Sequence, residues 1–261
     1  MIELCLESGS NTPLSPDVPL FHTVMVLAVH TAPLSFFAGQ TFHKLERYQE
    51  QWNDYKNISI QRRWTEMPVC TRLVAPLSRL AALKLPRIHE LVVFFDHSAP
   101  NYLWKKHIAV NANLSGLTLL GLRGIDNEWS PLTDITQILR PLSALETLVI
   151  DLVVPILTFF RDFIPMETSG LNQSSCEGQI SRVLCPRLQS LQIEGIEPTE
   201  ELELMPVLKD IVTRHAIIGS PLKSFTFYFD RDPGKKWEMI GRDGSFTMEE
   251  VVPAQRFQLN I

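Results

Sequence analysis

The sequence predicts an α/β fold, an irregular solenoid whose curved parallel sheet carries helices and loops on its outer face. The main observation is a short apolar frame that recurs, most clearly from Pro86 to Val93, from Pro186 to Ile193 and from Pro221 to Phe227. Each copy has a proline, then the pattern apolar-x-x-apolar-x-apolar. Segments with helical spacing of apolar residues lie between the copies. Recurrence of one short strand pattern with helical segments between its copies is typical of stacked strand–helix units.

The amino-terminal part of the chain carries weaker copies. Ile2 to Leu6 alternates between apolar and other residues, which predicts a short strand. Residues Phe21, Val24, Val26 and Val29 form the first copy of the frame, and Phe42 to Leu45 a second, degenerate one. The polar region from Glu46 to Glu66 is typical of an irregular loop with aromatic anchors. Leu73 to Leu85 has helical and then strand-like spacing.

The remaining copies predict strands that pair in sequence order. They are Ile88–Val93, Leu114–Leu119, Leu145–Ile150, Leu188–Ile193 and Leu222–Phe227, and their first residues are 26, 31, 43 and 34 residues apart. Apolar faces between them predict helices over 103–110, 132–139 and 156–163, and a further helix after Pro198 that buries Leu208, Ile211, Val212 and His215. The stretch 168–179 has the composition of a loop.

The frame resembles that of the leucine-rich-repeat family, whose regular repeats are about 20–29 residues long. The phrases Leu139 to Leu148 and Leu184 to Leu191 are more narrowly similar to the repeat regions of mushroom-type fungal F-box proteins. This resemblance implies a repeat region that selects a target for a ubiquitin ligase. In that family an F-box precedes the repeats and docks the ligase adaptor, whereas Leu85 to Leu91 here is a repeat strand rather than an F-box.

The predicted solenoid spans residues 1–229, with the clearest repeats in 85–229, and residues 230–261 form a capping segment. The tail contains the turns Asp232-Pro233-Gly234 and Arg242-Asp243-Gly244, with Trp237 and Phe246 nearby. A stacked core is exposed at the last repeat unless something covers it. We therefore expect the tail to cap the end through Trp237 and Phe246.

Composition narrows the classes of function. Hydrophobic residues make up 45% and charged residues 20% of the 261 residues, which is enough to bury a core, and the net charge of −5 gives no footprint for nucleic acid. The apolar stretch from Val18 to Phe37 is too broken for a membrane span. The first residues, Met1 to Glu7, do not have the pattern of a secretory signal. The four cysteines are scattered without metal-ligand spacing, which suits a reducing compartment. We therefore expect a cytoplasmic or nuclear protein.

Motifs for catalysis or cofactor binding do not occur in the sequence. A phosphate loop, a dinucleotide fingerprint, a G-x-S-x-G elbow and an H-E-x-x-H metal motif are missing. Asp151, Glu194 and Asp230 fall near predicted strand ends, either as catalytic carboxylates or as a polar rim; because they belong to different repeats, we favour the rim. We expect neither a cofactor nor a metal, and no enzymatic activity.

The remaining hypothesis is a monomeric, non-catalytic scaffold that binds a protein partner. Residues between the apolar positions of a frame point to the open face of the sheet. Together they form a mixed polar and aromatic strip of candidate partner-binding residues: His89, Glu90, Val92, Phe94, Glu146, Thr147, Gln189, Gln192, Glu194, Lys223, Thr226 and Tyr228. The alternatives are a degenerate relative without a partner, whose strip is merely solvated, and an enzyme without a recognisable motif.

Overall fold

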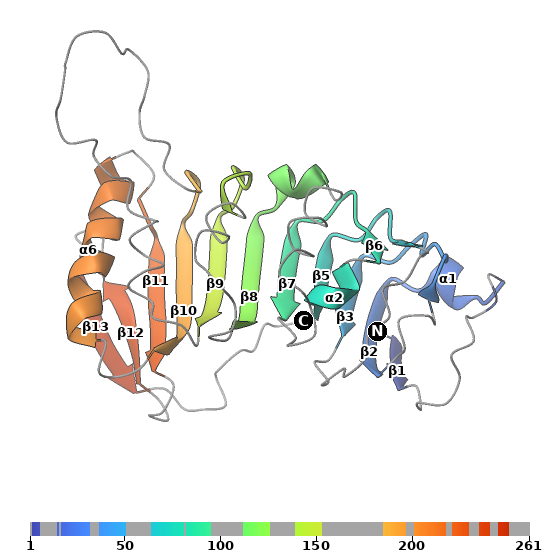
Figure 1. Cartoon of the computed structure of the whole chain (residues 1–261), viewed down its shortest axis with the longest axis horizontal. Coiled ribbons are helices and arrows are strands. Elements are labelled where there is room, and N and C mark those ends of the chain that lie inside the picture. Colours follow the sequence, from blue (N-terminus) through green and yellow to red (C-terminus); the bar gives the residue numbers. More distant parts are fainter. Residues whose placement is uncertain are drawn as a thin grey trace, which may run out of the picture. The chain divides into compact units, whose positions relative to one another are not determined.

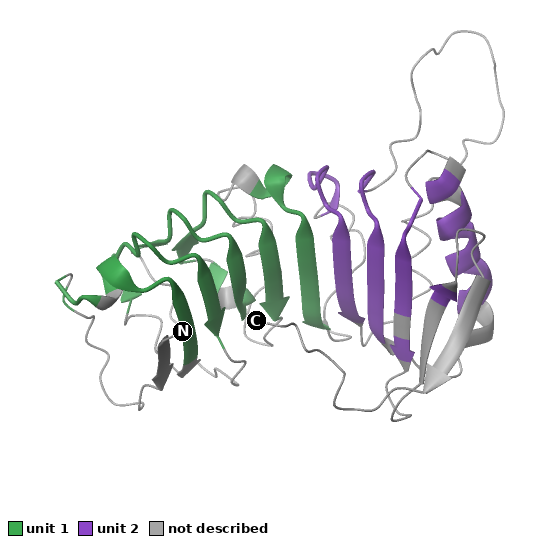
Figure 2. Ribbon diagram, turned by 180° about the vertical axis from the view of Figure 1, so that it is seen from behind, with its two compact units in different colours: residues 1–125 green, residues 126–261 purple. Residues whose placement is uncertain are grey.

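The structure, a computed structural model, divides into two compact units, residues 1–125 and residues 126–261 (Figure 2). It describes residues 2–5, 15, 17–31, 37–50, 64–80, 82–94, 112–125, 139–152, 185–196, 201–217, 221–229, 235–240 and 245–250. Taken together, these residues are mixed α/β, with mostly parallel strand pairing and few helices. The predicted α/β class with a parallel sheet is therefore confirmed. The predicted boundary between residues 229 and 230 stays a prediction.

Unit 1 contains a parallel sheet whose strands lie side by side in chain order (Figure 1). Its strands are β1 (Ile2–Cys5), β2 (Val26–Thr31), β3 (Arg47–Glu50), β5 (Arg72–Pro76), β7 (Glu90–Phe94) and β8 (Leu119–Ile125). A second, two-stranded parallel sheet pairs β4 (Thr65–Glu66) with β6 (Leu83–Lys84). Short helical turns complete the unit: α1 (Leu20–Thr23), α2 (Leu77–Leu80) and the 3₁₀ turn η2 (Ala112–Gly116).

Unit 2 contains three parallel strands followed by an antiparallel pair. The parallel strands are β9 (Thr147–Leu152), β10 (Ser190–Ile196) and β11 (Ser224–Phe229), and β12 (Lys235–Ile240) and β13 (Ser245–Glu250) continue the sheet in antiparallel fashion. The tail therefore pairs along the edge of β11, and the structure does not describe the side chains of Trp237 and Phe246 on which the predicted cap depends.

The helix predicted after Pro198 is confirmed as α6 (Glu201–Ile217). Its buried side chains recur at helical spacing, as expected for a helix with one apolar face. They are Leu204, Leu208, Ile211, Val212 and His215. Pro206 lies inside the helix and is exposed, so the interruption is on the solvent side.

The frame residues align across neighbouring strands. In unit 1, Leu73 lies in register with Leu91, and Leu91 with Leu120. In unit 2, Leu148 lies in register with Leu191, and Leu191 with Phe225. All of these side chains are buried. The frame therefore supplies one continuous apolar row within each unit.

A backbone hydrogen-bond pattern recurs at the start of the strands. The carbonyl of Thr71 accepts from the amides of His89 and Glu90 at 2.9 Å, directly before β7. The carbonyl of Gln189 likewise accepts from Lys223 at 2.7 Å and Ser224 at 3.0 Å, directly before β11. The carbonyls of Met25, Glu46, His89 and Glu146 each accept the same pair of hydrogen bonds from two successive amides at the start of the next strand. Successive strands are thus joined in the same way, whatever the length of the connection between them.

Two copies of the frame were predicted three residues too early. The strand expected at Leu114–Leu119 is β8 (Leu119–Ile125), with Leu117, Leu120 and Leu122 buried as its frame. The first copy is likewise Val24, Leu27 and Val29 rather than Phe21, Val24 and Val26. The reason is a further buried position three residues before each frame. Leu114 occupies it and accepts the amide of Leu117 at 3.0 Å in a turn, and Phe21 occupies it before Val24.

Three strands of unit 1 were not predicted, and one of them is β4, which lies at the end of the expected loop Glu46–Glu66. The expected loop over Glu46–Glu66 contains β3, and the expected helix from Leu73 begins instead with β5, whose helical turn α2 starts only at Leu77. In β3 the inward positions hold Tyr48 and Glu50 instead of aliphatic residues. The helices expected over 103–110 and 156–163 and the loop 168–179 lie outside the described residues, and of the helix expected over 132–139 only Leu139 is described.

The inward row of unit 1 contains a buried ion pair. Glu50, 1% exposed, lies in register with Val29, and Arg79 on α2 is 5% exposed. Arg79 donates from Nε to Glu50 Oε2 at 2.7 Å and from a terminal nitrogen to Oε1, and the Tyr48 hydroxyl donates to Oε2 at 3.0 Å. Paired, hydrogen-bonded charges of this kind are the form in which an apolar core accepts ionised groups.

Candidate functional site

Each sheet has a face that carries the residues between the frame positions, and we call it the opposite face. Alternation along a strand places these side chains away from the apolar row. In unit 1 it includes Arg47, Gln49, Arg72, Val74, Pro76, Glu90, Val92, Phe94, Leu119, Gly121 and Arg123. In unit 2 it consists of Thr147, Val149, Asp151, Ser190, Gln192, Glu194, Ser224, Thr226 and Tyr228.

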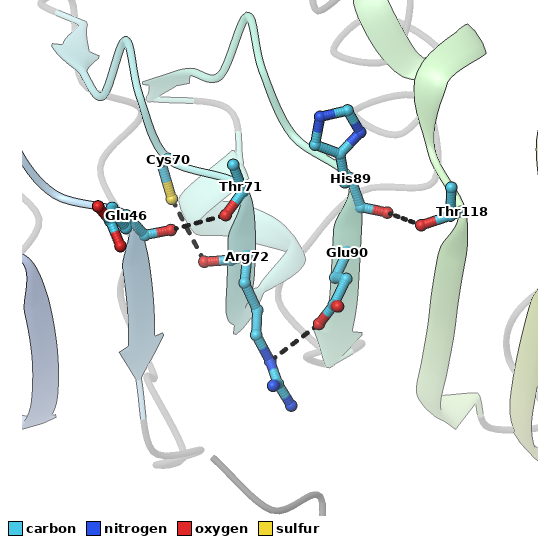
Figure 3. Close-up of polar contacts among 7 residues, drawn as sticks. All are labelled: Glu46, Cys70, Thr71, Arg72, His89, Glu90 and Thr118. Atoms are coloured by element: carbon cyan, nitrogen blue, oxygen red, sulfur yellow. Dashed lines mark hydrogen bonds and ion pairs between the residues drawn. The ribbon is translucent and has the colours of Figure 1, made fainter.

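One row of the opposite face in unit 1 is charged. Arg47, Arg72 and Glu90 follow one another in register on β3, β5 and β7. Arg72 Nε lies 3.2 Å from Glu90 Oε2, in an ion pair whose side chains are 17% and 41% exposed (Figure 3). Arg47 is exposed beside this pair. The row therefore places two guanidinium groups on neighbouring strands, one of them paired with Glu90.

A second row of the same face pairs an aromatic ring with a cation. Arg123 on β8 lies in register with Phe94 on β7, and its guanidinium carbon lies 5.8 Å from the ring centroid. This is the distance range of a cation–π contact. Both residues are half-buried. The contact holds the ring of Phe94 at the surface of the sheet.

Between these two rows, Gln49, Val74, Val92 and Gly121 follow one another in register, and the sheet is closely packed at Val92 and Gly121. A Cβ atom on Gly121 would lie 3.0 Å from Val92 Cγ2, so the missing side chain of Gly121 makes room for Val92. Val92 is only 4% exposed. Of the strip residues expected on this strand, Val92 therefore offers little surface, while Glu90 and Phe94 offer more.

Four residues of the strip lie beside the sheet face rather than on it. His89, Glu146, Gln189 and Lys223 each directly precede a strand and supply the carbonyl or amides of the recurring backbone bonds. The His89 carbonyl also accepts from Thr118 Oγ1 at 3.2 Å (Figure 3), and His89 Nδ1 lies 3.1 Å from the Gly116 carbonyl oxygen. The predicted strip thus separates into the opposite face and a row at the amino-terminal ends of the strands.

The opposite face of unit 2 is polar. Gln192 Nε2 donates to Glu194 Oε1 at 2.7 Å, and Glu194 lies in register with Asp151. Glu194 is buried, and Gln192, Thr147, Thr226 and Tyr228 are half-buried. This hydrogen bond orients the side-chain amide of Gln192, whose side-chain oxygen can accept a hydrogen bond from another group.

Sequence reasoning missed the cationic residues of unit 1. Arg47 and Arg72 lie on β3 and β5, which were not predicted, and Arg123 lies on the strand whose frame was shifted by three residues. Placing Leu120 and Leu122 in the frame would have put Arg123 on the opposite face by alternation. The segment Glu46 to Glu50 has no apolar alternation that would reveal a strand, because an inward position is occupied by the charged residue Glu50.

The described residues contain no group of three or more metal-ligating side chains. The thiols of Cys70 and Cys185 are both buried, and burial raises the pKa of each from 9.0 to about 12, so both are protonated at neutral pH. A protonated, buried thiol is a poor nucleophile and a poor metal ligand. Among the described helices, none has the length and apolar character needed to cross a membrane.

Comparison with known proteins found no matching family model, no similar curated protein and no similar solved structure.

Proposed function

We propose that the chain is an irregular leucine-rich-repeat-like solenoid that binds a protein partner through its opposite face and has no catalytic role. The recurring backbone bonds carry this proposal, because they join β2, β3, β5, β7 and β8, and β9 to β11, in one repeated geometry. In a solenoid each unit covers the apolar edge of the next and leaves an extended sheet face for binding.

The opposite face has the composition of a protein interface. Phe94 and Tyr228 are aromatic side chains at the surface, each with polar or charged neighbours on adjoining strands. Aromatic residues and arginine dominate the binding energy of protein interfaces when a polar rim surrounds them. Phe94 with Arg123 is such an anchor in unit 1, and Tyr228 with Thr226 in unit 2.

The proposal includes the role and the compartment that the sequence suggests. By its resemblance to fungal F-box repeat regions, the protein would select a target for a ubiquitin ligase whose adaptor is engaged elsewhere. Buried free thiols suit the reducing cytoplasm or nucleus, and the proposed protein is a monomer. Cell fractionation and cross-linking to ligase adaptors would test the compartment and the role.

The binding role is tested with a variant that removes three side chains of the opposite face, Phe94→Ala, Gln192→Ala and Tyr228→Ala. A matched control removes three exposed side chains elsewhere, Arg87→Ala, Arg140→Ala and Lys209→Ala. Proteins cross-linked to the wild type are identified and their dissociation constants measured. A true partner binds wild type and control alike, and loses about 30-fold or more with the face variant, the effect of truncating one anchor. Equal binding to all three proteins would refute the assignment of the face.

A further inference from the structure

Two exposed histidines of unit 1 stack on each other at the amino-terminal ends of neighbouring strands. The imidazole rings of His22 and His43 have centroids 5.3 Å apart and planes inclined by 9°. His22 belongs to α1, before β2, and His43 lies in the turn before β3. Both side chains are exposed. Two imidazoles from consecutive repeats therefore meet in solvent.

The repeat itself places the two rings side by side. Each histidine directly follows a buried phenylalanine and stands two residues before the first buried residue of its frame. The rings of these phenylalanines, Phe21 and Phe42, contact each other edge to face with centroids 4.9 Å apart. The amide of His43 also donates to the Phe21 carbonyl at 3.0 Å. Core packing and backbone thus hold the two histidines at a set spacing.

The separation of the rings matches that of two imidazoles on one metal ion. A transition metal binds an imidazole nitrogen at about 2.0–2.1 Å, and so lies about 3.2 Å from the ring centroid. At the tetrahedral angle of a zinc site, two such rings have centroids about 5.2 Å apart. The nearly parallel rings must turn about their Cβ–Cγ bonds before both nitrogens face one ion. This torsion is soft, and neither imidazole makes a hydrogen bond with the described residues that would oppose the turn.

We infer that His22 and His43 form a surface site for a divalent transition-metal ion of the zinc type, for which neutral imidazole is a favoured ligand. The described residues supply no third ligand beside them, so water or a group of a partner completes the coordination. The sequence expectation of no metal rested on motif spacing, and two ligands from different repeats form no such motif. The inference goes beyond the proposed binding of a protein and does not depend on it.

The first measurement uses the wild-type chain without an affinity tag. Zn²⁺ is titrated while the C2 protons of the seven histidines are followed by NMR. We expect two signals to shift together and to saturate at one equivalent, because one ion binds both rings. Spectra of His22→Gln and His43→Gln assign these signals. Shifts that belong only to other histidines, or that saturate at two equivalents, would overturn the inference.

Calorimetry then shows whether the two rings act as one site. A single exposed imidazole binds an ion weakly, whereas a second imidazole held beside it acts at a high effective concentration. Each single variant should therefore weaken Zn²⁺ binding about 100-fold, and the double variant should bind hardly more weakly than either one. Two independent sites give the opposite result, because each single variant then keeps the affinity and loses half of the stoichiometry.

His89 provides the matched control, since it is an exposed histidine of the same unit whose Nδ1 lies 3.1 Å from the Gly116 carbonyl oxygen. His89→Gln should leave the affinity for Zn²⁺ unchanged. Mg²⁺ prefers oxygen ligands and should not compete with Zn²⁺. A loss with His89→Gln as large as that with His22→Gln, or displacement of Zn²⁺ by Mg²⁺, would count against the pair.

Thermal unfolding separates the loss of a ligand from the loss of the fold. Without metal, the double variant should unfold near the wild-type temperature, because both replaced side chains are exposed. Zn²⁺ should raise the midpoint of the wild type and of His89→Gln, and leave that of the double variant unchanged. Equal stabilisation of all three proteins would refute the site. If the double variant is already unstable without metal, the wild-type NMR titration decides, since it needs no variant to count the histidines that bind.

Discussion

Replacing Glu50 with leucine tests how the core of unit 1 holds its charges. Glu50→Leu removes the acceptor of two hydrogen bonds from Arg79 and of one from Tyr48. Arg79 then remains a charge on a side chain that is 6% exposed. Breaking a buried ion pair in this way typically costs about 3–5 kcal/mol, and the lost Tyr48 bond adds about 1 kcal/mol. We expect the free energy of unfolding to fall by about 4–6 kcal/mol.

The double variant Glu50→Leu with Arg79→Leu separates the two contributions. The position in register with Glu50 in β2 is the buried Val29, so a leucine at position 50 continues an apolar row. Replacing both partners of a buried pair with apolar residues is typically neutral or stabilising. We expect the double variant to lie within about 1 kcal/mol of the wild type, which gives a coupling energy of at least about 2 kcal/mol.

An exposed ion pair in the same unit provides the control. Lys84 Nζ lies 2.6 Å from Glu66 Oε1, with side chains 50% and 46% exposed. Glu66→Gln should cost less than about 1 kcal/mol because water already solvates both charges. Urea unfolding followed by circular dichroism measures the wild type, Glu50→Leu, Arg79→Leu, the double variant and Glu66→Gln. The stabilities are compared where the slopes against urea concentration are similar. A cost below about 1 kcal/mol for Glu50→Leu, or a double variant as unstable as the two single variants combined, would refute the reasoning.

Three further predictions concern the core, the thiols and the tail. Leu148→Ala or Leu191→Ala should cost about 2–5 kcal/mol in the same assay, since both side chains are fully buried, and a loss under about 0.5 kcal/mol would contradict this. At pH 8 iodoacetamide should label Cys70 and Cys185 far more slowly in the folded protein than in urea, and equal labelling would contradict their burial. Because the folded state holds the thiol protons more tightly, the free energy of unfolding should stay level below pH 9 and fall by about 1.4 kcal/mol per pH unit per thiol between pH 9 and about 12. A level profile above pH 9 would also contradict the burial. Deleting residues 231–261 removes β12 and β13 from the edge of β11 and should cause aggregation or sensitivity to proteolysis. A shortened chain that is as soluble and protease-resistant as the full one would contradict this prediction.

The sequence predicted the parallel strands where the frame is purely aliphatic. Leu145, Leu148 and Ile150 predict β9 because an apolar residue at each inward position gives an unambiguous pattern. The same rule misplaced β8, because Leu114 and Leu117 precede Leu120 at equal spacing and the run can start at either one. Local spacing alone does not distinguish the turn residue from the first frame residue. The register with Leu91 distinguishes them.

Strand β3 was missed for an energetic reason. Its inward residues are Tyr48 and Glu50, and Glu50 is tolerated there only because Arg79 reaches it from a turn 29 positions further along the chain. No periodicity in Arg47–Glu50 reveals a partner so distant in sequence. The candidate site was affected in turn, since Arg47 and Arg72 were assigned to no face. Phe94, Gln192 and Tyr228 were placed correctly on the opposite face because the frame around them was unambiguous.

The antiparallel pair at the end of unit 2 has a consequence for how this part of the chain folds during synthesis. Only residues 241–244 separate β12 from β13, whereas residues 197–223 separate β10 from β11. Short loops close at lower entropic cost, and hairpins form within about 1–10 μs. The ribosome adds residues 235–250 after β11, in about 1–3 s at the usual elongation rate of about 5–20 residues per second. During that interval the β11 edge is open to pairing with another chain, and the hairpin closes it almost as soon as the residues emerge.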